Sequence, residues 1–129
     1  MTHSTGSGRA QAPRSIDFSV LDELRALQAD DEPDIVGEVV ALFLSDSPRR
    51  VEAIAASVAA KDAVRLGKEA HGLKGSAANV GAAKLRSICE QLERLGKAGQ
   101  TADAPPLVSA LITEYQQVAR ELSPLATQA

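Results

Sequence analysis

The chain has 129 residues, which suits one domain with a single core and excludes a two-domain enzyme, and its aromatic content of 2% argues for packed helices rather than a β-sandwich or barrel. The formal net charge is −3, from 14 basic and 17 acidic residues without a basic run, which argues against a nucleic-acid binder. The chain has one cysteine, no apolar stretch near the roughly 18 residues of a membrane span, and no signal-peptide core. Together these features predict a cytoplasmic protein without a membrane partner.

The first segment of the chain is polar. Residues 1–15 are rich in small and hydroxyl side chains without a hydrophobic period, so we predict a disordered tail or linker in which His3 has no role. We predict that residues 16–125 form the domain and that residues 126–129 form a C-terminal tail.

Apolar residues recur at helical spacing in the first half of the remaining chain. An amphipathic stretch ends at the acidic turn Asp30–Pro33, and a second one follows it. Ser47–Pro48 pairs a capping hydroxyl with a proline at a first helical position, which predicts the start of another helix. The apolar stripes are Val20, Leu21, Leu24 and Leu27; Ile35, Val36, Val39, Val40 and Phe43; and Val51, Ile54, Ala55 and Val58.

Three further helices are predicted in the second half. Asp62 caps a helix that runs to about Val80 and stops at Gly81. The next helix is closed by Gly96 and Gly99. The last helix opens at Asp103 with Pro105–Pro106 and ends at Pro124, and the apolar stripes of these two helices are Leu85, Ile88, Cys89, Leu92 and Leu95, and Leu107, Leu111, Tyr115, Val118 and Leu122.

These elements predict an all-α fold. No segment alternates convincingly at period two, and loops this short make neighbouring helices antiparallel, which gives a helical bundle. Cys89 lies on a leucine stripe and is expected to serve packing only, so it does not join His71 in a zinc site.

The helix over residues 62–80 carries an exposed histidine. At about 100° per residue, His71 points about 140° away from the centre of the core stripe. Three glycines inside this one helix each cost about 1 kcal/mol relative to alanine, and clearance for a second surface beside the imidazole explains them. The core stripe is Leu66, Ala70, Leu73, Ala77 and Val80; the glycines are Gly67, Gly72 and Gly75.

The surroundings of His71 favour covalent capture of an anionic group. Neutral imidazole is a competent nucleophile near pH 7, and Lys74, at i+3, supplies a cation for an anion held on the ring. A phosphoryl group fits this chemistry. The face around His71 is the candidate docking surface for a partner, and it comprises Val64, Gly67, Lys68, Gly75, Ala78 and Asn79.

The segment Ala70–Ala82, AHGLKGSAANVGA, resembles the signature of histidine-containing phosphotransfer (HPt) domains of two-component phosphorelays. The likeness extends to Leu42–Leu44 with Ser47–Pro48 and to Cys89–Glu93, and it covers roughly residues 17–123. It implies an antiparallel four-helix bundle with an additional short N-terminal helix. It also implies a carrier that moves a phosphoryl group between aspartates of receiver domains.

The resemblance assigns roles to individual residues. His71 is the phosphoryl acceptor and donor through Nε2, Lys74 holds the phosphate, and Gly75 gives the receiver room. The residue at the Glu93 position hydrogen-bonds the other imidazole nitrogen. Because the family more often has Gln there, Glu90, one turn earlier, is the alternative for this orienting role.

The resemblance also implies the partners. They are response-regulator receiver domains and a hybrid sensor histidine kinase, and Mg²⁺ belongs to the receiver, so the chain itself needs no metal or cofactor. We expect a monomer without ATP-binding or kinase activity, because no nucleotide loop is present. A non-catalytic adaptor that binds a receiver without carrying phosphate is the alternative, and a purely structural module is a third reading. The sequence leaves open whether the chain stands alone or is part of a hybrid kinase.

Overall fold

The part of the chain that the computed structural model describes, residues 14–28 and 34–126, is helical almost throughout. The turn expected at Asp30–Pro33, residues 1–13 of the expected tail with His3, and residues 127–129 lie outside the described residues. The elements are α2 (Phe18–Ala26), α3 (Ile35–Ala59), α4 (Ala63–Asn79), α5 (Ala83–Ala98) and α6 (Pro105–Leu122), with 3-10 turns η1 (Thr101–Asp103) and η2 (Ser123–Leu125).

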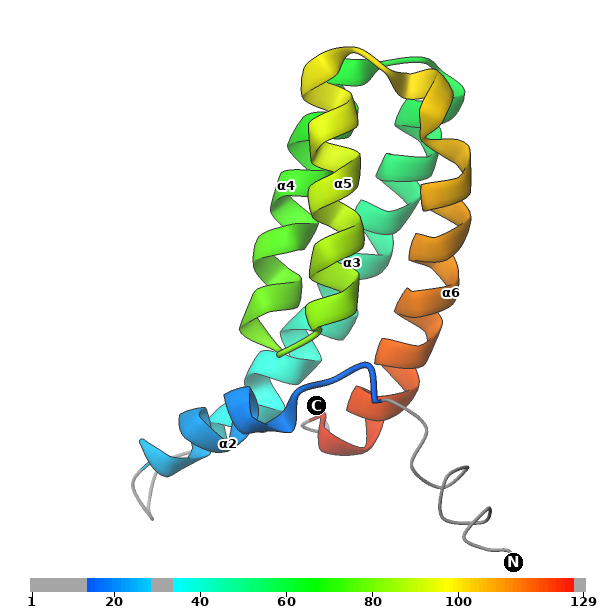
Figure 1. The fold of residues 1–129 in the computed structure, drawn as a ribbon. Helices are drawn as coiled ribbons and strands as arrows, with labels where there is room; N and C mark the ends of the chain where they lie inside the picture. Colours follow the sequence, from blue (N-terminus) through cyan, green and yellow to red (C-terminus); the bar gives the residue numbers. More distant parts are fainter. Residues whose placement is uncertain (1–13, 29–33, 127–129) are drawn as a thin grey trace, which may run out of the picture.

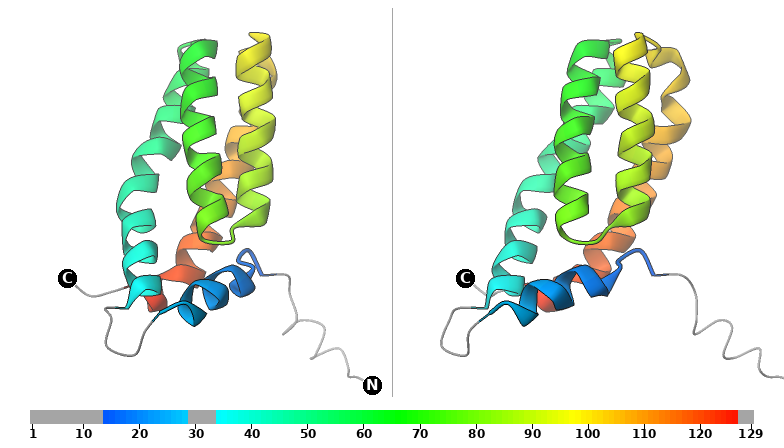
Figure 2. Two further views of the ribbon diagram at one scale, coloured as in Figure 1. Left: turned by 90° about the vertical axis from the view of Figure 1, so that its left-hand side faces the viewer. Right: turned by 60° about the vertical axis from the view of Figure 1, so that its left-hand side comes forward.

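Helices α3, α4, α5 and α6 run up and down in turn and form the bundle, while the short α2 lies across one end of it (Figures 1 and 2). No strand occurs among the described residues. The predicted all-α class, with four antiparallel helices and an extra N-terminal helix, is confirmed.

The core is built from branched aliphatic side chains of all the helices. Each helix of the bundle turns a stripe of such residues inward, and α2 adds Leu21, which is only 1% exposed. The four-residue spacing of the α4 stripe leaves its opposite face to solvent. The fully buried large side chains are Leu21, Val36, Val40, Ile54, Leu66, Leu73, Val80, Leu85, Leu92, Leu111, Val118 and Leu122.

Helix α3 is one continuous helix of 25 residues, so the helix start predicted at Ser47–Pro48 is wrong. Pro48 lies inside α3 and has no N–H for the carbonyl four residues earlier, which ordinarily costs about 3 kcal/mol. Packing of α3 against the rest of the bundle offsets this cost. The buried Ser47 hydroxyl donates to the carbonyl of Phe43 and lies 2.7 Å from the hydroxyl oxygen of Tyr115. Buried residues on both sides of the proline also hold the two halves against the same core.

The turn between α4 and α5 is fixed by a glycine. Gly81 has a φ of +76°, and a Cβ there would meet the carbonyl oxygen of Asp17 at 2.4 Å. The N–H of Asp17 also donates to the carbonyl of Gly81 at 2.7 Å. The start of α2 is therefore tied to the end of α4, where Gly81 stops the helix as predicted.

The ends of the last two helices differ from the prediction. Gly99, with φ of +71°, ends α5, whereas Gly96 lies inside that helix. Asp103 belongs to η1, and α6 begins after Ala104 without a side-chain cap. The proline at the first position of α6, Pro105, is where the sequence predicts it.

Gly96 allows α4 and α5 to approach closely. A Cβ on Gly96 would meet the backbone nitrogen of Gly67 at 2.6 Å and the carbonyl oxygen of Ala63 at 2.9 Å. The two helices therefore touch backbone to backbone at this point. One turn away from this contact, His71 of α4 faces Glu93 of α5.

The described N-terminal residues are fastened to α6. The backbone N–H groups of Ser15 and Ile16 each donate to the Glu121 carboxylate at 3.0 Å. Both residues are buried. Ser15, which the sequence places at the end of a tail, therefore contacts the bundle.

Candidate functional site

Helix α4 presents His71 to solvent. The N-cap Asp62 accepts from the N–H of Arg65 at 3.1 Å and starts the helix, and the core stripe that follows is buried as predicted. The side chain of His71 is 70% exposed, on the face opposite Leu73. The predicted exposed imidazole in mid-helix is confirmed.

Glu93 of α5 holds one nitrogen of the ring. Its carboxylate Oε2 lies 2.9 Å from Nδ1 of His71, and the residue is 5% exposed. Glu90, the alternative, is half exposed and instead faces Arg94 at 3.7 Å. Of the two carboxylates that the sequence leaves open, the structure therefore brings Glu93 to the imidazole.

Two lysines also bind Glu93. Lys74 Nζ lies 2.7 Å from Oε1 and Lys97 Nζ lies 3.3 Å from Oε2. The hydrogen bond from Lys74 lowers the pKa of Glu93 from its ordinary 4.5 to about 2, against burial, which raises it; His71 and Lys97 lower it further. Glu93 is therefore ionised at neutral pH.

An ionised Glu93 sets the tautomer of His71. A carboxylate without a proton can only accept a hydrogen bond, so Nδ1 of the neutral ring must carry the proton. The lone pair then lies on Nε2. In this neutral form, the ring presents a nucleophilic nitrogen, Nε2, that is not occupied by Glu93.

Lys97 is a residue that the sequence interpretation missed. It stands four residues after Glu93 on α5, the spacing at which a carboxylate and an ammonium group pair on a helix surface. That spacing was the available signal. Lys74, expected near a phosphate on the ring, lies instead against Glu93 and is 25% exposed.

A groove of about 610 Å³ runs along the α4–α5 side of His71. It brings together three of the predicted docking residues, of which Val64 is 75% exposed, while Gly67 forms part of the helix contact described above. The groove is lined by Ala63, Val64, Gly67, Lys68, His71, Glu93, Gly96 and Lys97.

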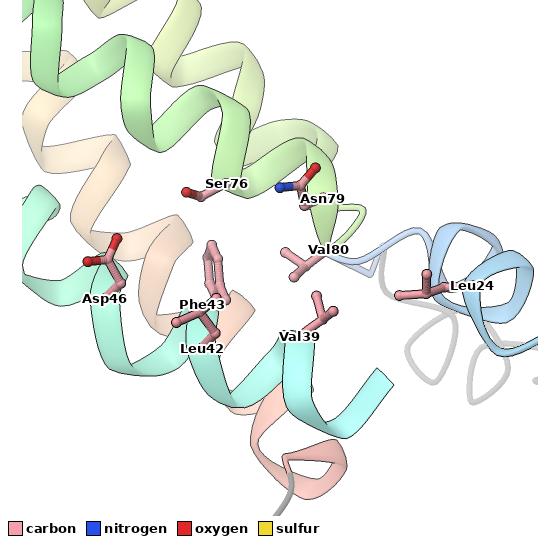
Figure 3. A pocket seen from close by; sticks show the side chains of 8 residues that line it. All are labelled: Leu24, Val39, Leu42, Phe43, Asp46, Ser76, Asn79 and Val80. Atoms are coloured by element: carbon pink, nitrogen blue, oxygen red, sulfur yellow. The ribbon is translucent and has the colours of Figure 1, made fainter. Parts of the chain in front are cut away.

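A second pocket, of about 400 Å³, opens where α2, α3 and α4 meet (Figure 3). Asn79 is the only predicted docking residue that lines it, and the sequence interpretation did not anticipate the pocket. Leu42, at its edge, is 70% exposed. The lining of this pocket is mainly apolar and consists of Leu24, Val39, Leu42, Phe43, Asp46, Ser76, Asn79 and Val80.

The three glycines of α4 lie in different surroundings. A Cβ on Gly75 would meet nothing within 4 Å, so this position is open, as is the exposed Ala78 beyond it. At Gly72 a Cβ would meet the guanidinium of Arg50 of α3 at 2.3 Å. Gly67 faces the backbone of α5. The predicted clearance beside the imidazole therefore applies to Gly75, whereas Gly72 makes room for an arginine of the bundle itself.

Cys89 belongs to the core. It is fully buried on α5, and burial raises the pKa of its thiol to about 12, with Glu93 contributing. The thiol and the exposed imidazole of His71 face different environments. Packing is the role that the sequence predicts for it.

Comparison with known proteins identifies relatives of this chain. The family model described as Hpt domain matches residues 38–121. Histidine-containing phosphotransfer protein 4 of Arabidopsis thaliana is 32% identical over 105 residues, which cover 80% of this chain and 77% of that protein. Multistep phosphorelay regulator 1 of Schizosaccharomyces pombe is 31% identical over 86 residues, 67% of this chain and 29% of that protein.

A solved structure has the same fold. The crystal structure of histidine-containing phosphotransfer protein B (HptB) from Pseudomonas aeruginosa PAO1 matches with a TM-score of 0.77 at 27% identity, over 88% of this chain and 95% of that one. Some relatives are much longer than the match, which spans 29% of the S. pombe protein and 45% of histidine-containing phosphotransfer protein 5 of A. thaliana. No helix in the described part of the chain is long and apolar enough to cross a bilayer.

Proposed function

Because this chain belongs to the Hpt domain family, we propose that it carries a phosphoryl group on Nε2 of His71 between the aspartates of two receiver domains. The observation that carries this proposal is the pairing of an exposed imidazole with the ionised Glu93, 2.9 Å from Nδ1. It supplies a nitrogen nucleophile in the required tautomer at the surface of a rigid helix.

The transfer step follows from this geometry. The lone pair of Nε2 attacks the phosphorus of an aspartyl phosphate in line, and the bond between phosphorus and the aspartate oxygen breaks. The electron pair of that bond stays on the aspartate, which leaves as a carboxylate. The ring of His71 keeps its Nδ1 proton and becomes positively charged while it bears the phosphoryl group.

Lys74 supplies a nearby cation for the transferred group. Its ammonium group lies 2.7 Å from Oε1 of Glu93, the residue that also contacts the ring, which supports this role. A charge-assisted contact with a phosphoryl oxygen would stabilise the product. The shared contact with Glu93 is the reason that we assign Lys74 to the transfer site.

The partners proposed here are receiver domains of response regulators and of a hybrid sensor histidine kinase, and the receiver brings the Mg²⁺ that phosphoryl transfer uses. The docking surface is the open face around His71. Gly75 leaves the ring accessible, and the groove beside it exposes Val64 and Lys68. The apolar pocket that contains Leu42 adds surface on the other side of α4.

We propose a carrier rather than an enzyme, and a monomer in the cytoplasm. The phosphorylated receiver supplies the phosphoryl group in the first step and the phosphohistidine supplies it in the second, so the chain needs no nucleotide. An adaptor that binds a receiver without carrying phosphate has the same surface but needs no reactive nitrogen at His71.

A labelling experiment separates carrier from adaptor. A receiver domain labelled on its aspartate with radioactive phosphate is mixed with the wild-type chain and with His71→Gln. We expect acid-labile, base-stable label on the wild type and none on the variant, with both proteins folded because His71 lies outside the core. Equal labelling of the two would refute His71 as the acceptor, and binding without label on either would favour the adaptor.

A further inference from the structure

The group that accepts the hydrogen bond from Nδ1 of His71 carries a negative charge, which is not needed to fix the tautomer of the ring. A neutral amide oxygen at the same position would also accept the Nδ1 proton. Glu93 adds a full negative charge, is 5% exposed and accepts from Nδ1 at 2.9 Å. That charge acts on the proton most strongly when the ring is a cation.

The ring is a cation in one state of the proposed cycle. When Nε2 bonds to phosphorus, it gives up its lone pair, and a ring that retains the Nδ1 proton is an imidazolium. If that proton is lost to water, the phosphorylated ring is neutral, and breaking the nitrogen–phosphorus bond then releases an imidazolate anion, a poor leaving group. The protonation of Nδ1 therefore decides how readily His71 gives the phosphoryl group away.

We propose that Glu93 keeps the proton on Nδ1 of His71 in every state of the cycle, so that the phosphorylated ring remains an imidazolium and leaves as neutral imidazole. This inference rests on the proposed function, and it assigns Glu93 as a positioning residue that sets donor strength as well as tautomer.

The transfers balance without any proton exchanged with solvent. In the first step a neutral imidazole and an aspartyl phosphate give a phosphoimidazolium and an aspartate carboxylate. In the second step the nitrogen–phosphorus bond breaks, its electron pair returns to Nε2, and a new bond forms between phosphorus and an oxygen of the accepting aspartate. The Nδ1 proton stays on its hydrogen bond to Glu93 in both steps.

The charges around the ring are compatible with this role. On α4 and α5, Lys74 and Lys97 pair with Glu93, and their positive charges oppose its hold on the Nδ1 proton. A phosphoryl group on Nε2 offers these ammonium groups a second anion. Each lysine that turns to it leaves more of the Glu93 charge to the ring. The side chain of Lys97 is 74% exposed and is not confined by packing.

The remaining charged groups nearby are either solvated or paired. Lys68 is exposed on α4, at the edge of the groove. From α3, the Arg50 guanidinium lies over Gly72, and it is bound to Asp46 and Glu69, each at 3.3 Å. Neither Lys68 nor Arg50 is paired with Glu93.

The test phosphorylates His71 of the full chain with phosphoramidate, a small-molecule donor, so that no partner protein is needed. The ¹⁵N signal of Nδ1 is then followed against pH in the wild type, in Glu93→Gln and in Glu90→Gln. Glu90→Gln is the matched control, because it removes one carboxylate a turn earlier on α5 and does not contact His71.

We expect Nδ1 of the phosphorylated wild type to remain protonated at pH 8. Its titration midpoint should lie at least one pH unit above that of Glu93→Gln, a tenfold difference in proton affinity. Glu90→Gln should titrate as the wild type does. The phosphohistidine of Glu93→Gln should also hydrolyse several-fold more slowly at pH 8.

Equal midpoints in wild type and Glu93→Gln would overturn the inference. So would a deprotonated Nδ1 in the phosphorylated wild type at pH 8, a result that requires no variant to fold. Normal transfer from a receiver with an unshifted titration leaves the proposed function standing and removes this inference alone. A shifted titration without any transfer from a receiver supports the effect of Glu93 on the Nδ1 proton but counts against the proposed function. Failure of phosphoramidate to label His71 counts against both.

Discussion

At the scale of single residues, neighbours on α4 have opposite surroundings. Gly75 faces open space, whereas the side chain of Lys74 is held against the buried Glu93. Both positions lie within one turn of His71, so their side chains affect the same chemistry by different means. Bulk matters at the first position and charge at the second.

Substitution of Gly75 tests the clearance beside the imidazole. Gly75→Ala and Gly75→Gln should both fold, with melting temperatures equal to or above that of the wild type. Replacement of a glycine in a helix interior stabilises the helix by up to about 1 kcal/mol. Gly75→Gln should accept phosphoryl groups much more slowly, because a long side chain obstructs the close, in-line approach of the receiver aspartate.

Gly75→Ala is the control, because it also removes the glycine but adds only a methyl group, and it should retain most of the transfer rate. Thermal unfolding and label transfer from a phosphorylated receiver measure the two effects separately. A Gly75→Gln protein that unfolds, or that transfers at the wild-type rate, would show that an open surface is not what the glycine provides.

Substitution of Lys74 tests the cation. Lys74→Ala should accept the phosphoryl group about tenfold more slowly, as expected for the loss of a charge-assisted hydrogen bond worth about 1.5 kcal/mol. It should also raise the pKa of Glu93, whose principal partner it removes. Arg65→Ala, at another exposed cation of α4, should change neither quantity. An unchanged rate in Lys74→Ala would show that the lysine only pairs with Glu93 and does not assist the transfer.

At the scale of elements, the α4–α5 pair depends on one glycine. Gly96→Ala should destabilise the fold by about 2 kcal/mol, since its Cβ would meet the backbone of Gly67 at 2.6 Å and backbone atoms cannot move aside cheaply. Gly67→Ala is the matched control: its Cβ would meet the backbone of Gly96 at an ordinary 3.9 Å. That variant should be as stable as the wild type or more so. Urea unfolding measures the difference, and equal stabilities would show that the helices can separate at no cost.

The helices with strong periodicity could be predicted from the sequence, and contacts between helices could not. The stripe of α4, its cap at Asp62 and its stop at Gly81 follow from local spacing and backbone chemistry. The position of Pro48 inside α3 could not be predicted, because the cost of an interior proline is local, while the packing that offsets it comes from distant segments, including Tyr115.

The same limit applies to the site. The exposure of His71 follows from the geometry of one helix, and a carboxylate partner for it followed from the resemblance. The choice of Glu93 over Glu90, and the addition of Lys97, depend on the rotation of α5 against α4. That rotation belongs to the packing of the two helices, of which the backbone contact at Gly96 is one part, and local periodicity does not reveal it.

At the scale of the whole molecule, paired carboxylates make stability depend on pH. The pKa of Glu93 falls from 4.5 to about 2 in the folded chain. Burial raises the pKa of Glu121, but hydrogen bonds from Gln117, Ser15 and Ile16 lower it more. A lowered folded-state pKa stabilises the fold above the unfolded-state value, and this stabilisation is lost as the pH falls toward the folded-state value.

We therefore expect the free energy of unfolding to fall as the pH is lowered from about 4.5 toward 2. Glu93→Gln should lose less stability over this range than the wild type, because it lacks one of the carboxylates that must be protonated. Glu90→Gln serves again as the control, and urea unfolding at several pH values gives the comparison. Parallel pH profiles for the wild type and Glu93→Gln would contradict this account.

The tie from Ser15 and Ile16 to Glu121 brings the two ends of the described chain to the same end of the bundle (Figure 1). The α5–η1 turn at Gly99–Gln100 lies at the other end and is exposed. The order of the helices along the chain can therefore be changed by circular permutation. A short linker can join residue 126 to residue 14, and the chain can be opened after Gly99 to give new termini. Such a permuted chain should fold and present His71 unchanged, because His71 and its partner Glu93 both lie within the α4–α5 hairpin, which the cut leaves whole.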